Sequence, residues 1–119
     1  MAKPQDIVAR TFQFALKIVE LANQLDYCRE PTRVLAKQIL RSGTSIGANI
    51  EEAQAAESRA DFIHKYNIAL KEARETKYWL RLISDSQFAK KTDLASLIKE
   101  SDEICRIIAQ IVINARREK

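Results

Sequence analysis

The chain has 119 residues, of which 20 are Lys or Arg and 16 are Asp or Glu, so its formal charge is +4. This length fits one domain, and we expect a single domain over residues 1–119. Two glycines and two prolines are too few for the turns of a many-stranded sheet. The composition therefore predicts an all-α protein.

The sequence contains no recognisable membrane or export segment. The N-terminal residues lack an apolar signal core, and the apolar stretch at 104–113 is interrupted by Arg106 and Gln110. Cys28 and Cys105 fit no spacing typical of a zinc site, a redox motif or a disulfide framework, and we expect both to be inert, buried thiols. We therefore expect a cytoplasmic protein that does not contact a membrane.

The first predicted helix runs from about Pro4 to Tyr27 and carries two neighbouring apolar stripes. One stripe is Ile7, Phe14, Ile18, Leu21 and Leu25, and the other is Val8, Phe12, Ala15, Val19 and Ala22. Together they cover about half of the helix circumference, which is more than a simple bundle seam needs. The second stripe either widens the core or marks a protein interface.

The second predicted helix runs from about Pro31 to Ala56 and has Gly43 and Gly47 in its middle. Each glycine costs a helix about 1 kcal/mol relative to Ala, so the helix either breaks near residues 41–45 or uses the glycines. Their four-residue spacing places both on one face, where a neighbouring helix could approach closely. We favour a continuous, closely packed helix.

Two more helices follow. Ser58 and Asp61 have the spacing of a capping box that starts the third helix, and a turn at residues 84–86 ends it. The fourth helix, from about Thr92 to Arg116, has apolar residues at heptad spacing. Because the connections are short, neighbouring helices should be antiparallel, which predicts an up-down-up-down four-helix bundle.

Residues for catalysis are not apparent. His64 is the single histidine, and no Glu-x-x-His pair is present to build a di-iron site. Glu51 and Glu52 are adjacent, so their side chains diverge on a helix, and the segment between Gly43 and Gly47 has no P-loop lysine. We therefore expect no enzyme, no metal and no cofactor.

Basic residues form two groups at helical spacing. They are Arg29, Arg33, Lys37 and Arg41 on the second helix, and Lys71, Arg74 and Arg81 around Tyr78 on the third. Such cations can neutralise phosphates, and the tyrosine can stack on a base, which favours nucleic-acid binding. The alternative is an ordinary solvated helix face, because Glu72 and Glu75 are near enough to neutralise part of the charge.

The third helix also has an apolar flank beside its core stripe. Ile68, Trp79 and Leu82 lie on this flank, and such a surface favours a protein interface. The alternative is that the bundle core itself uses these side chains.

Two segments, LRSGTSIGANIEEA at residues 40–53 and SRADFIHKYNIALKEARETKYWL at 58–80, resemble the bacterial 23S rRNA intervening-sequence proteins, also called four helix bundle proteins. The resemblance covers nearly the whole chain and implies a four-helix bundle that assembles into a homopentamer. An accessory protein of diversity-generating retroelements has the same architecture, forms a basic pentameric barrel, and binds nucleic acid and a reverse transcriptase. The family motif falls on Arg41, Ser42, Gly43, Ser45, Gly47, Asn49, Glu51 and Glu52, for which the resemblance implies packing and interface geometry.

These observations support one hypothesis and one alternative. The hypothesis is a homo-oligomeric accessory protein that binds RNA or DNA phosphates without reading sequence. The alternative is an oligomeric scaffold that recruits another protein through Ile68, Trp79 and Leu82, with its charge serving solubility.

Overall fold

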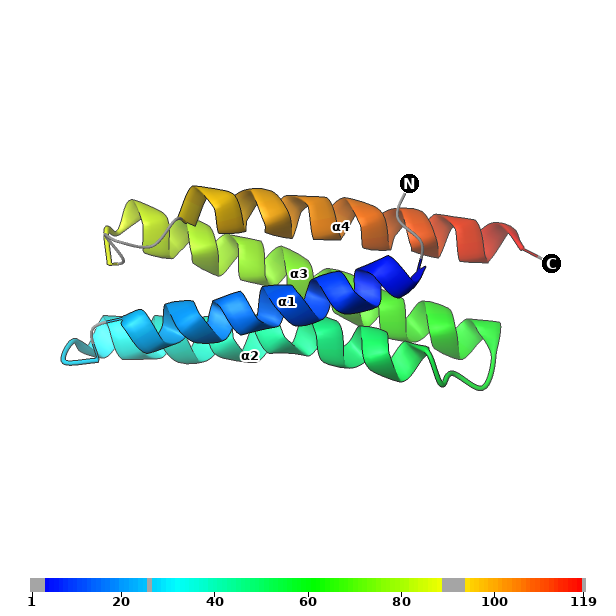
Figure 1. Cartoon of the computed structure of the whole chain (residues 1–119), viewed down its shortest axis with the longest axis horizontal. Coiled ribbons are helices and arrows are strands. Elements are labelled where there is room, and N and C mark those ends of the chain that lie inside the picture. The colour runs from blue at the N-terminus through cyan, green and yellow to red at the C-terminus, as the bar shows by residue number, and fades with distance from the viewer. Residues whose placement is uncertain (1–3, 26, 89–93, 119) are drawn as a thin grey trace.

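Four α-helices account for most of the chain in a computed structural model that describes residues 4–25, 27–88 and 94–118, with side chains from Ile7 onward. They are α1 (Pro4–Gln24), α2 (Glu30–Ala53), α3 (Arg59–Asp85) and α4 (Leu94–Arg117). Successive helices run in opposite directions along a bundle 52 Å long (Figure 1). The predicted antiparallel bundle is therefore confirmed.

The helix ends follow local capping rules. The Ser58 side chain accepts a hydrogen bond from the Asp61 N–H at 3.0 Å, as the capping box predicts. After α3, Gln87 adopts a left-handed φ of 60°, which lets the Phe88 N–H reach the Ile83 carbonyl at 3.3 Å.

The predicted helix boundaries were close, and the differences lie at the ends. α1 ends at Gln24 and α2 at Ala53, each three residues earlier than predicted, because both predictions extended the helices into the connecting segments. The predicted start of the fourth helix at Thr92 lies outside the described residues.

The core combines the predicted stripes of all four helices. Its largest fully buried side chains are Tyr66, Phe14, Ile7, Ile18, Leu21, Ile39, Ile46, Ile50, Leu80, Ile83, Ile104 and Ile108. The polar residues that interrupt these stripes find partners within the bundle. The buried Thr76 hydroxyl lies 2.9 Å from the Ser42 hydroxyl and donates to the Glu72 carbonyl, while Ser101 donates to the Ile98 carbonyl.

The two glycines let α1 and α2 pack closely. A Cβ at Gly43 would lie 2.8 Å from Cγ2 of Ile18, and a Cβ at Gly47 would lie 3.4 Å from the Thr11 backbone. α2 continues through both positions without a break, so the predicted continuous helix is confirmed. The glycines are buried inside the protomer and do not line an exposed surface.

One side of the bundle is less closed than the others. α1 packs extensively on α2 but contacts α4 over a much shorter stretch. In this stretch Arg10 donates to Glu100 through Nε and Nη2, both at 2.7 Å, and to Glu103 at 2.6 Å. These hydrogen bonds raise the pKa of Arg10, so its charge is retained at all accessible pH values.

Candidate nucleic-acid interface

A basic surface lies on the outer face of α3. Lys71, Arg74 and Arg81 are exposed, at helical positions that bring them onto one side of the helix. Among the described residues, none of these three cations has a hydrogen-bonding or ion-pair partner. The helix therefore presents three cations that are available to an anionic ligand.

Tyr78 lies within this group of cations. It is 54% exposed, and its ring meets the ring of Trp79 edge-on, with the centroids 5.2 Å apart. The edge contact holds one side of the tyrosine and leaves much of the ring exposed to solvent. A nucleobase could stack there while the neighbouring cations contact phosphates.

The basic surface extends across the seam to α4. Lys77 and Arg106 both approach the carboxylate of Asp102, at 2.9 Å and 3.0 Å. The hydrogen bond from Lys77 lowers the pKa of Asp102, which therefore stays ionised at neutral pH. Two cations thus share one carboxylate, and this seam keeps a net positive charge.

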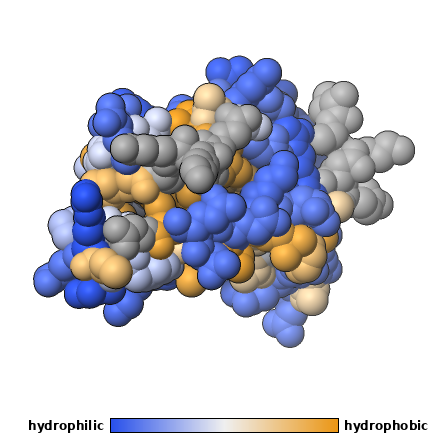
Figure 2. Space-filling view, turned by 60° about the vertical axis from the view of Figure 1, so that its left-hand side comes forward, coloured by the Kyte–Doolittle hydropathy of each residue, from blue (hydrophilic) through white to orange (hydrophobic). Residues whose placement is uncertain are grey.

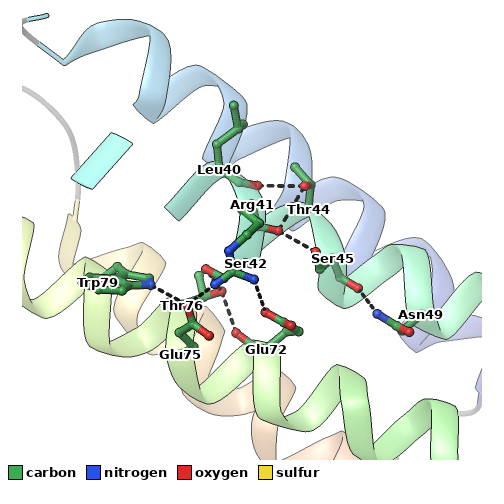
Figure 3. A network of polar contacts seen from close by, with 10 residues as sticks. All are labelled: Leu40, Arg41, Ser42, Thr44, Ser45, Asn49, Glu72, Glu75, Thr76 and Trp79. Carbon is green, nitrogen blue, oxygen red and sulfur yellow. Dashed lines mark hydrogen bonds and ion pairs between the residues drawn. The ribbon is translucent and has the colours of Figure 1, made fainter. Parts of the chain in front are cut away.

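The basic residues of α2 are partly occupied by contacts within the chain. Arg41 pairs with Glu72 at 3.2 Å and with Glu75, both on α3 (Figure 3). Arg33 donates to the Tyr27 carbonyl at 3.2 Å.

Arg29 and Lys37 are exposed, and their side chains have no partner among the described residues. Two cations of the predicted α2 group are therefore available to a ligand, and the other two are engaged in contacts within the chain.

The contact between Arg41 and α3 also involves the predicted apolar flank. Trp79 donates its indole N–H to Glu75 at 3.0 Å, so the tryptophan, the carboxylate and Arg41 form one chain of contacts (Figure 3). Trp79 packs against the core and is half-buried. Ile68 and Leu82 are also half-buried. Part of this flank therefore serves the protomer's own packing.

Three exposed apolar side chains share one face of α1. Phe12, Leu16 and Val19 are 56%, 44% and 46% exposed, whereas the other stripe of α1 is buried. Phe12 and Val19 belong to the second predicted stripe, and Leu16 was not predicted as part of either. Figure 2 shows hydrophobic surface between hydrophilic residues in several places on the face it presents.

The thiols and the histidine occupy ordinary positions. His64 is exposed. Cys28 is also exposed, which corrects the expectation of two buried thiols, because it lies in the connection between α1 and α2. Cys105 is half-buried, and its burial raises the pKa of its thiol despite the nearby charge of Arg74.

Within residues 4–25, 27–88 and 94–118, no group of three or more His, Cys, Asp or Glu side chains is placed to hold a metal ion. None of the four described helices combines the length and the apolar character that a membrane crossing requires.

The fold and surface define the class as a small all-α bundle protein with a basic outer face. The family model of the 23S rRNA-intervening sequence protein matches residues 3–110, and the chain belongs to this family. The resemblance seen in the sequence is thereby confirmed.

A solved structure supports the same assignment. The chain is 45% identical to a protein of unknown function from the S23 ribosomal protein family of Bacteroides thetaiotaomicron VPI-5482. The match covers 93% of this chain and 98% of that one, with a TM-score of 0.85. Among curated proteins, none matches the chain significantly.

Proposed function

We propose that this protein is a non-enzymatic, homo-oligomeric accessory protein of the cytoplasm that binds nucleic acid through the outer face of α3. The observation that carries the proposal is the group of Lys71, Arg74 and Arg81, all exposed and without partners among the described residues, around the exposed ring of Tyr78. Each cation can displace a condensed counterion from a phosphate, so binding should be strongly salt-dependent.

The distribution of surfaces supports an assembly. Exposed apolar side chains gather on α1, while the available cations of α3 lie on a different helix. Copies that associate through α1 would keep their basic faces open to the solvent. Several basic faces on one particle bind a polyanion more tightly than one face alone, because the contacts are linked.

Fluorescence anisotropy against salt concentration tests the basic face. The variant K71Q/R74Q/R81Q removes three cations from it, and K17Q/R116Q/R117Q removes three exposed cations elsewhere. If the α3 cations contact phosphates, the first variant reduces the slope of log K against log salt by about 2 to 3, and the second changes it little. An equal loss in both variants would show that net charge alone drives binding.

The tyrosine gives a separate test of the kind of nucleic acid. Stacking on a base is worth about 1–3 kcal/mol, so Y78A should weaken binding to single-stranded RNA while Y78F retains it. Duplex DNA keeps its bases stacked and should be insensitive to both changes. Sensitivity of neither ligand to Y78A would remove the tyrosine from the interface.

The alternative function is an oligomeric scaffold without nucleic-acid binding. The observation that favours it is the exposed apolar surface of α1, since such surfaces mark protein contacts. Ile68, Trp79 and Leu82 stay a predicted contact surface, which Trp79→Ala tests through the mass in light scattering. An oligomer that binds neither RNA nor DNA at low salt would establish the scaffold.

A further inference from the structure

A groove of about 830 Å³ lies at the end of the bundle where α2 ends, α3 begins and α4 ends. Its apolar lining includes Phe62, Ile107 and Ile111, and side-chain amides of Gln110 and Asn114 line it as well. Among the polar residues that line it, Ser58 caps α3, Arg106 pairs with Asp102, and Gln110 donates to Asn114 at 2.9 Å. It is large enough to receive apolar side chains from another helix.

The register of α1 against α4 explains the groove. Arg10 lies level with Glu100 and Glu103, and the helices are antiparallel, so the first turn of α1 lies level with about Ile107. α4 continues to Arg117 and therefore extends past the first residue of helix α1. The apolar flank of α4 beyond this level has no α1 segment opposite it.

The outer stripe of α1, defined by Phe12, Leu16 and Val19, has the form of a groove-binding helix face. Its residues are spaced four and three apart, the pattern with which amphipathic helices insert anchors into grooves. With Val8 the stripe is about 16 Å long, and the groove residues on α4, from Arg106 to Glu118, extend over about 18 Å at 1.5 Å per residue. The two surfaces match in length and in apolar character.

We propose that the outer stripe of α1 in one copy docks into the bundle-end groove of a second copy. The proposal rests on the homo-oligomeric assembly proposed above and names the two surfaces that form its interface. The stripe lies beyond the α1–α2 contact marked by Gly43 and Gly47, and it faces away from the Arg10 side that meets α4. A copy therefore cannot fill its own groove with its own stripe.

Charge around the two surfaces favours this pairing. Glu20 lies beside the stripe, one turn after Leu16, and its side chain has no partner among the described residues. Two cations, Arg59 and Arg106, and one carboxylate, Glu118, line the groove, so its lining carries a small positive excess. Arg106 also pairs with Asp102 at 3.0 Å. Opposite charges at the rim orient the two copies and raise the rate of association.

The contact is heterologous because the stripe and the groove are different surfaces. Each docked pair still has one unused stripe and one unused groove, so further copies add in the same direction. Such a contact closes into a ring when the rotation between copies permits it. A stripe that paired with another stripe would instead stop at a dimer.

Two variants separate these arrangements. The stripe variant F12E/L16E places acidic side chains on exposed positions of α1, and the groove variant Q110E/N114E places acidic side chains on exposed positions in the groove, where they repel the acidic rim of the stripe. All four sites are exposed helical positions, so both variants should fold, which circular dichroism checks. The control Q13E/K17Q changes the charge of α1 by the same amount as the stripe variant, outside the stripe.

Light scattering reads the result. The wild type and the control should be oligomers of one size, and each of the two variants alone should be a monomer. Mixed in equal amounts, the variants should form a two-chain complex, because the groove variant keeps its stripe and the stripe variant keeps its groove.

Two outcomes would overturn the docking, and they are distinguishable. A groove variant that retains the wild-type mass would show that the stripe pairs with some other surface, while the assembly itself stands. A monomeric wild type at 100 µM, a concentration on the order of those where weak interfaces form, would refute the assembly and the docking together.

Discussion

Alanine substitution at the two glycines of α2 should have opposite effects on stability. Each Gly→Ala change removes about 1 kcal/mol of unfavourable helix propensity. At Gly47 the new Cβ would lie 3.4 Å from the Thr11 backbone, an ordinary contact, so the free energy of unfolding should rise by about 1 kcal/mol.

At Gly43 the new Cβ would lie 2.8 and 2.9 Å from two carbons of Ile18, a fully buried side chain. Such overpacking typically costs about 1–3 kcal/mol, so with the propensity gain we expect a net loss of about 1 kcal/mol. The gain in helix propensity is the same in both variants. The difference of about 2 kcal/mol between their free energies of unfolding therefore measures the packing of α1 on α2.

Urea unfolding at one fixed protein concentration measures both variants, and the fixed concentration keeps any assembly contribution constant. The double variant Gly43→Ala with Ile18→Ala is a second check. Ile18→Ala removes the two γ carbons and leaves only the Cβ of residue 18 at 3.2 Å, so Gly43→Ala should destabilise much less in that background. A Gly43→Ala protein as stable as Gly47→Ala would refute the argument from close helix packing.

Three further predictions follow from individual contacts. Burial raises the pKa of Tyr66 above its usual 10.0, so its contribution to stability is complete below pH 10 and is lost as the pH rises through the raised pKa; urea unfolding should show a steeper alkaline loss in wild type than in Y66F. A thiol reagent at pH 8 should modify Cys105 slowly because burial raises its pKa, and urea should remove that protection; fast modification of the folded protein would contradict the burial. Arg10→Gln should lower the free energy of unfolding by about 1 kcal/mol, since the pair is partly exposed, and added salt should reduce the difference.

Much of the fold could be predicted from local patterns. The helical period of Ile7, Phe14 and Ile18 identified the buried face of α1, and Ser58 with Asp61 marked the start of α3. The spacing of Gly43 and Gly47 predicted a close helix contact, although it did not say which helix would come close. Such features depend on a few residues within one helix, which is why the sequence alone reveals them.

Features that depend on the register between helices were not predicted. The sequence showed two apolar stripes on α1 but could not say that Phe12 and Val19 would be exposed, because that depends on how α1 sits against α2 and α4. Arg41 was predicted within a basic stripe, and its contacts with Glu72 and Glu75 follow from the pairing of α2 with α3. The bundle-end groove likewise depends on where α1 begins relative to α4.

The short contact between α1 and α4 also bears on how the protein opens. α2 and α3 each pack extensively against two neighbours, whereas α1 is held mainly by α2. In native-state hydrogen exchange, the amides of α1 should therefore exchange through a partial opening of lower free energy than global unfolding, while those of α2 and α3 report the global value. The helix that carries the exposed apolar stripe is thus the one whose protection an assembly would change most.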